Sequence, residues 1–286
     1  MDGIPEQGLF GPESVSWRVH GDPVMGLAGV RALLLQALHP LAMAGVAQHS
    51  AYREDPWGRL YRTAFFIGAT TYGTGPQVAE AVARVRRVHA HVTGFEPQTG
   101  QRYRADDPRL LTWVHCTEVG SFLEVTRAAG LPLTDAEADR YLTEQTTVAR
   151  LVGVPPGHPL PGSTEQLARY FAQVRPELRL TPEAREAARF ALLPPLPAWV
   201  RYGTPARPAW AGLAALAFAL LPRWACRMYG VPLPRAARPV AVAQARVLRA
   251  GLLTLPRRVR EGPHLRAARE RYSARALSPG CGTRRG

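Results

Sequence analysis

Apolar residues recur at helical spacing between Pro76 and Gly94 and predict one amphipathic helix. Pro76 suits the first helical position, and Gly94 suits the stop just beyond the last turn. The apolar face carries four valines and a histidine: Val78, Val82, Val85, His89 and Val92. His89 is therefore expected to face the interior. His91 lies about 200° away around the helix and is expected to face outward.

The same spacing predicts further helices along most of the chain, broken by Pro and Gly. A proline after His39 is expected to kink or restart the helix over 30–50, and residues 93–105 are expected to form a hairpin or compact loop. The fold class is thus predicted to be all-α, with an N-terminal arm (1–27), one large helical domain (28–255) and a basic C-terminal helix and tail (256–286). The other predicted helices cover residues 57–72, 109–129, 134–152, 165–175, 183–193, 209–221, 239–255 and 263–277.

Charge is distributed unevenly, although the net charge of the 286 residues is +14. All 36 basic residues are arginine, so no lysine can serve as a base or iron ligand. Residues 1–222 hold 21 Arg against 20 Asp and Glu, whereas residues 223–286 hold 15 Arg against two Glu. The basic region lacks interleaved aromatics, so we expect no nucleic-acid partner. Together with the apolar segment 209–221, it predicts a peripheral contact with an anionic membrane.

Neither a secretion signal nor a cysteine framework is evident. The first residues lack a basic segment followed by an apolar run, and the longest apolar run has thirteen residues, too few to cross a bilayer. The three cysteines are scattered, which indicates neither disulfides nor a thiolate metal site. We therefore expect a cytoplasmic protein, with peripheral membrane contact as an addition.

Three predicted helices each place a histidine on the apolar side: His39, His89 and His115. Each has two interpretations, a buried structural histidine or a member of a binding site; for His89 the second is an axial ligand of a buried haem. Arg59 and Thr63 share a face of the helix over 57–72, where they form either a pocket for an anion or oxygen species or ordinary helix surface.

Six ordered motifs resemble the bacterial MpaB-type oxygenase family, which is related to the latex-clearing rubber oxygenases. The similarity covers roughly residues 20–230. The motifs are Leu35-Gln36-Ala37-Leu38-His39-Pro40, Gly45-Val46-Ala47-Gln48-His49-Ser50, Asp55-Pro56-Trp57-Gly58-Arg59-Leu60-Tyr61-Arg62-Thr63, Val85-Arg86-Arg87-Val88-His89, Tyr103-Arg104-Ala105-Asp106-Asp107-Pro108 and Trp113-Val114-His115.

The resemblance implies an all-α fold with a globin-like core, and a b-type haem that uses O₂ to cleave carbon–carbon double bonds in isoprenoid chains. His89 matches the proximal iron ligand, and Arg59 and Thr63 match polar residues of the haem pocket. Arg62 stands where the rubber enzymes have a lysine that closes the distal side of the iron. An arginine stays protonated and is a poor ligand, so this closed state is not expected here. His39 and His115 are candidates for orienting the haem or lining its distal side.

The leading hypothesis is a haem b-dependent oxygenase that acts on an apolar, isoprenoid-like substrate with O₂. A haem protein that binds gas without catalysis is the first alternative. A helical interaction protein with structural histidines is the second.

Overall fold

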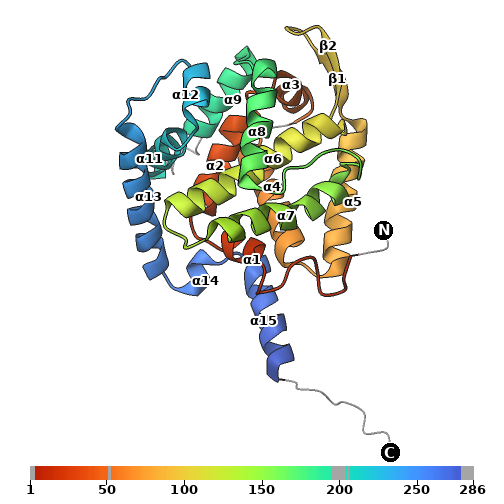
Figure 1. Ribbon diagram of the computed structural model, residues 1–286, viewed down its shortest axis with the longest axis vertical. Helices are drawn as coiled ribbons and strands as arrows, with labels where there is room; N and C mark the ends of the chain where they lie inside the picture. Colours follow the sequence, from red (N-terminus) through yellow and green to blue (C-terminus); the bar gives the residue numbers. More distant parts are fainter. Residues whose placement is uncertain (1–3, 51–52, 195–203, 205, 278–286) are drawn as a thin grey trace, which may run out of the picture.

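Helices make up nearly all the regular structure of the computed structural model, which describes residues 4–50, 53–194, 204 and 206–277 (Figure 1). The all-α prediction is confirmed, and the segment 93–105 is a two-stranded antiparallel hairpin. The elements are α1 (Val15–His20), α2 (Met25–Gln36), α3 (Pro40–His49), α4 (Pro56–Tyr72), α5 (Gly75–His91), β1 (Thr93–Glu96), β2 (Gln101–Arg104), α6 (Pro108–Ala128), α7 (Asp135–Val152), α8 (Thr164–Val174), the 3₁₀ turn η1 (Arg175–Glu177), α9 (Pro182–Leu192), α11 (Ala206–Ala219), α12 (Arg223–Met228), α13 (Ala237–Thr254), α14 (Arg257–Arg260) and α15 (Pro263–Leu277).

Local capping explains where the central helices begin. The Asp55 carboxylate accepts a hydrogen bond from the Gly58 N–H at 2.8 Å, and Pro56 occupies the first helical position of α4. Asp107 and Pro108 start α6 in the same way. Thr134 and Glu137 form a reciprocal capping box at the start of α7. These starts follow from short sequence patterns, and the structure confirms them.

Helix α6 lies at the centre of the main hydrophobic core, with α2 packed along it (Figure 1). Trp113 and Phe122 are fully buried on α6, and Leu34 is fully buried on α2. The Trp113 indole N–H donates to the Gln36 carbonyl at 3.2 Å, which joins the end of α2 to α6. The core therefore fixes the direction of the helix that carries His115.

Pro40 separates α2 from α3, as the sequence predicts, and the two helices meet at 106°. His39, just before the proline, has the extended backbone that a following proline favours. Among the described residues no single helix is long and apolar enough to cross a membrane, and this bent pair passes only a test of length and composition.

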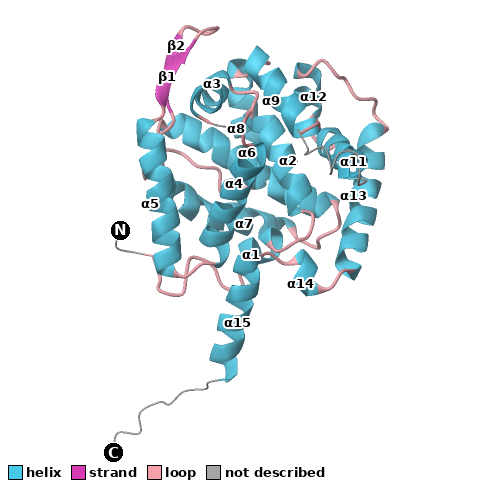
Figure 2. Cartoon of the chain, turned by 180° about the vertical axis from the view of Figure 1, so that it is seen from behind, coloured by secondary structure: helices cyan, strands magenta, loops and turns pink. Residues whose placement is uncertain are grey.

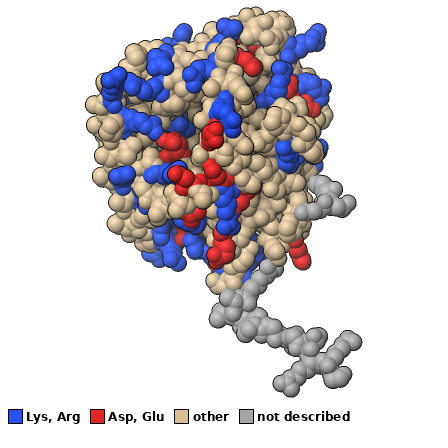
Figure 3. All heavy atoms as spheres, viewed as in Figure 1, with Lys and Arg blue, Asp and Glu red and all other residues tan. Residues whose placement is uncertain are grey.

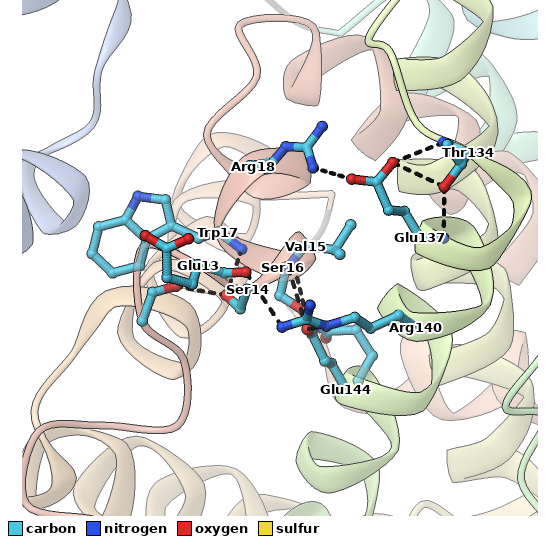
Figure 4. Close-up of polar contacts among 12 residues, drawn as sticks. Glu13, Ser14, Val15, Ser16, Trp17, Arg18, Thr134, Glu137, Arg140 and Glu144 are labelled. Atoms are coloured by element: carbon cyan, nitrogen blue, oxygen red, sulfur yellow. Dashed lines mark hydrogen bonds and ion pairs between the residues drawn. The ribbon is translucent and has the colours of Figure 1, made fainter.

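The N-terminal segment packs against the body through α1. Val15 and Val19 belong to the main core. Glu144 on α7 accepts hydrogen bonds from the Ser16 N–H and the Ser16 hydroxyl, both at 2.8 Å (Figure 4). A carboxylate at a helix N-terminus satisfies otherwise unpaired N–H groups, and this contact links residues more than a hundred positions apart.

The C-terminal helix α15 also packs on the body near α1 and α4. Leu265 and Ala268 join Trp17 and Tyr72 in a small separate core. The hairpin β1–β2 follows α5, packs on α3 and projects from the end of the molecule opposite α15 (Figure 2). This arrangement places α15 against α4, where one of its side chains reaches the candidate site.

Candidate functional site

A cavity of about 1090 Å³ lies between the N-terminal helices, α5 and α6, and its walls are mostly apolar. This volume is at the upper end of typical ligand sites, so a cofactor and a substrate have room together. Residues from many segments of the chain contribute to the wall. Representative apolar members are Leu41, Val46, Phe66, Ala81, Val85, Leu111 and Val148.

His89 lines this cavity from α5, as its place on the apolar face predicts. Val78 and Val82 on the same face are buried. The Nδ1 atom of His89 is buried and has no hydrogen-bond partner. Burial lowers the pKa of His89, with a smaller opposing effect from Asp106, so the imidazole is neutral at physiological pH. His91 faces away, with its Nδ1 2.7 Å from the Arg87 carbonyl.

His115 and Glu118 reach the same cavity from α6. The Nε2 atom of His115 is buried without a partner, and burial lowers the pKa of this histidine to about 4. Glu118 follows one turn later, and burial raises the pKa of its carboxyl to about 7. Glu118 is not among the site residues that the sequence predicts. The pattern that could have predicted it is its position three residues after His115, next to the apolar face of the helix over 109–129.

Three polar residues line the cavity from α4, but the structure holds them differently. The Arg59 guanidinium donates to the Ser50 hydroxyl at 2.6 Å, and the Thr63 hydroxyl donates to the Arg59 carbonyl at 3.1 Å. Arg62 is exposed and pairs with Asp55 at 3.3 Å. Arg59 and Thr63 therefore lie together on the inner side, whereas Arg62 is at the outer edge.

His39 does not line the cavity. It is buried at the start of α3, with its ring 5.8 Å from that of Trp113 and its Nε2 3.9 Å from a Glu177 carboxylate oxygen. Burial lowers its pKa to about 4, and its Nδ1 has no partner. The structure brings together five of the six predicted site residues and leaves His39 apart from them.

A further histidine, His264, reaches the cavity from α15. Its ring packs edge-on to Phe65 of α4, with centroids 4.7 Å apart, and its Nε2 is buried without a partner. Gly68 permits this approach, because a β-carbon there would lie 2.6 Å from the His264 ring. No local pattern predicts this residue, since its place depends on how α15 folds back.

The residues fit a haem better than a bare ion. Among the residues that the structure describes, no three His, Cys, Asp or Glu side chains are grouped to hold a metal. One imidazole can bind iron when a porphyrin supplies the equatorial ligands. His89 meets this requirement, because it is neutral, unbonded and set in the wall of a large apolar cavity.

One family model matches the chain, over residues 17–250, and it describes the ER-bound oxygenase mpaB/B′ and rubber oxygenase catalytic domain. The match includes every cavity residue named above except His264, which lies beyond it. No curated protein and no solved structure matches the chain.

Proposed function

The chain belongs to the family of MpaB/MpaB′ and rubber oxygenase catalytic domains, and from this membership we propose that it is a haem b-dependent oxygenase acting on an apolar substrate with O₂. The observation that supports this proposal best is an unbonded, neutral imidazole, His89, in the wall of a large apolar cavity. When bound, the haem supplies the O₂ chemistry, and the chain controls binding, orientation and access.

The chain's own residues have separable tasks in this proposal. His89 offers a nitrogen lone pair to the iron, since burial keeps its ring uncharged. Arg59, held by Ser50, provides a permanent positive charge that suits a propionate or another anionic group. Thr63 lines the cavity one turn later, and its hydroxyl donates to the main-chain carbonyl of Arg59. Arg62 cannot replace an iron-binding lysine, and its pairing with Asp55 keeps it at the edge.

An apolar substrate suits the opening of the cavity. Four lining side chains on α4 and α5 are exposed to solvent: Trp57, Tyr61, Phe65 and Val88. Exposed apolar side chains along the lining of a cavity are typical of sites that admit apolar ligands. We propose an isoprenoid-like alkene as the substrate class.

Oxygen uptake tests the proposal. Protein produced with haem available should consume O₂ when an isoprenoid alkene is added, and the cleaved or oxygenated product should accumulate. Arg59→Ala and Thr63→Ala should keep the haem absorption but reduce turnover at least tenfold. Haem binding without O₂ uptake would favour the gas-binding alternative, and protein without haem would favour structural histidines.

We also propose a peripheral contact between the C-terminal region and an anionic membrane. Val247, Leu255 and Val259 are exposed there beside Arg257 and Arg258. Arginines gather over α11–α13, on the left of the space-filling view, whereas acidic side chains cluster nearer the centre (Figure 3). Binding to anionic vesicles should weaken as salt rises, because charge attraction is screened over about 8 Å at physiological ionic strength. Equal flotation with neutral and anionic vesicles would contradict it.

A further inference from the structure

Glu118 is a partly buried acidic side chain in the cavity wall. Among the described residues, no hydrogen bond or ion pair reaches its carboxyl group, and burial raises its pKa to about 7. His115, one turn earlier on the same side of α6, has an unpartnered buried Nε2. Residues three apart on a helix are neighbours, with about 5–6 Å between their β-carbons. The two groups therefore offer one polar spot in an otherwise apolar wall.

The unpartnered ring nitrogen of His115 is costly to bury, and the Glu118 carboxyl beside it has no partner among the described residues, so this spot suits a ligand that forms hydrogen bonds. A cationic head group fits poorly, because three arginines line the cavity (Arg59, Arg62 and Arg84) against the acids Glu80 and Glu118. An anionic head would meet the ionised form of Glu118 with repulsion. A neutral group that both donates and accepts a hydrogen bond fits the carboxyl and the imidazole alike.

We propose that Glu118 and His115 bind the hydroxyl head of a long-chain alcohol whose apolar chain occupies the rest of the cavity. This inference rests on the proposed function and narrows its substrate class from an apolar molecule to an apolar alcohol. Glu118 is a specificity-determining residue in it: its carboxylate accepts a hydrogen bond from the hydroxyl group, and the neutral His115 ring is a second partner for the oxygen.

The energetic expectation is a preference for the hydroxyl group. A hydrogen bond to a charged group in a water-poor site changes affinity about tenfold or more. An ether of similar length fills the same apolar space but has no proton to donate. The alcohol should therefore bind about tenfold more tightly than the ether at pH 8, where Glu118 is mostly ionised and can only accept.

Titration calorimetry of the protein with its cofactor, at pH 8, tests the proposal with dodecanol and dodecyl methyl ether. The wild type should prefer dodecanol about tenfold. Glu118→Gln should keep part of the preference, because the amide oxygen still accepts a hydrogen bond. Glu118→Leu should abolish it. Glu124→Gln is the matched control, since Glu124 lies on α6 outside the cavity and pairs with Arg238; it should behave as the wild type.

Equal affinity for the two probes in the wild type would overturn the proposal, as would an undiminished preference in Glu118→Leu. The Gln variant keeps the test informative if the Leu variant does not fold. Calorimetry needs no turnover, so the two proposals can fail separately. A hydroxyl preference without O₂ uptake would refute the oxygenase and leave this subsite standing, whereas O₂ uptake without the preference would do the reverse.

Discussion

His20 and His89 are both inward-facing histidines, yet the chain treats them in opposite ways. His20 uses both ring nitrogens: Nδ1 lies 2.7 Å from the Thr71 hydroxyl, and Nε2 lies 2.9 Å from the Tyr141 hydroxyl. Burial lowers its pKa to about 3. His89 lines a cavity and leaves its buried Nδ1 without a partner. Burial alone therefore does not separate a structural histidine from a functional one.

The difference lies in which polar side chains have hydrogen-bond partners within the protein. Away from the cavity, most buried polar groups of α6 bond within the protein, as Thr117 and Thr126 do to carbonyls one turn earlier. On the cavity side, His115 and Glu118 have no such bonds. Three of the seven described side chains that have a buried polar atom without a partner line this cavity: His89, His115 and His264. Because unsatisfied buried groups reduce stability, we interpret these three as groups kept for a ligand.

The largest effect on stability should come from His20→Ala. The change leaves the buried Tyr141 and Thr71 hydroxyls without partners and opens a hole, so the free energy of unfolding should fall by about 3 kcal/mol. Urea denaturation measures it. His91→Ala is the control, because His91 is exposed, and it should stay within about 0.5 kcal/mol of wild type. An unchanged free energy of unfolding in His20→Ala would show that the hydrogen bonds of His20 to Thr71 and Tyr141 do not stabilise the fold.

Glu118→Gln should make the protein more stable at high pH. Because burial raises the pKa of Glu118 from 4.5 to about 7, the unfolded chain releases this proton at lower pH than the folded protein. A shift of this size corresponds to about 3 kcal/mol, and the partial exposure of the side chain reduces it. The wild type therefore loses about 2 kcal/mol of stability as pH rises from about 4.5 to 7, and the Gln variant does not. Denaturation at pH 8 and pH 4.5 measures the difference in free energy of unfolding between the variant and the wild type, and this difference should be smaller at pH 4.5. A difference in free energy of unfolding that does not change with pH would contradict a raised pKa for Glu118.

The smallest effect should come from Arg62→Ala. This side chain is exposed and its ion pair with Asp55 is on the surface, so the free energy of unfolding should change by less than about 0.5 kcal/mol. Haem absorption per mole of protein should also stay the same, because Arg62 is not expected to bind the iron as a lysine at this position could. Loss of haem in this variant would show that Arg62 belongs to the haem-binding site, and would contradict its assignment to the outer edge of the cavity.

Local patterns predicted much of the fold and part of the site. Caps such as Asp55-Pro56 and Thr134–Glu137 are contained in a few consecutive residues, and the stripes of α5 and α6 placed His89 and His115 inward. The remaining features depend on contacts between distant segments. His20 meets partners 51 and 121 positions away, and His264 reaches the cavity only because α15 packs on α4. The domain boundaries and the globin-like core stay predictions.

The haem absorption of His89→Ala tests the central claim most directly. The Soret band per mole of protein is measured beside the thermal midpoint, with His115→Ala and His39→Ala as controls. His89→Ala should lose most of its haem while the midpoint changes little, since its Nδ1 has no partner to leave unsatisfied. The controls should keep their haem. If His115→Ala loses the haem and His89→Ala keeps it, or if wild-type protein made with haem available shows no Soret band, the assignment of His89 as the iron ligand is wrong.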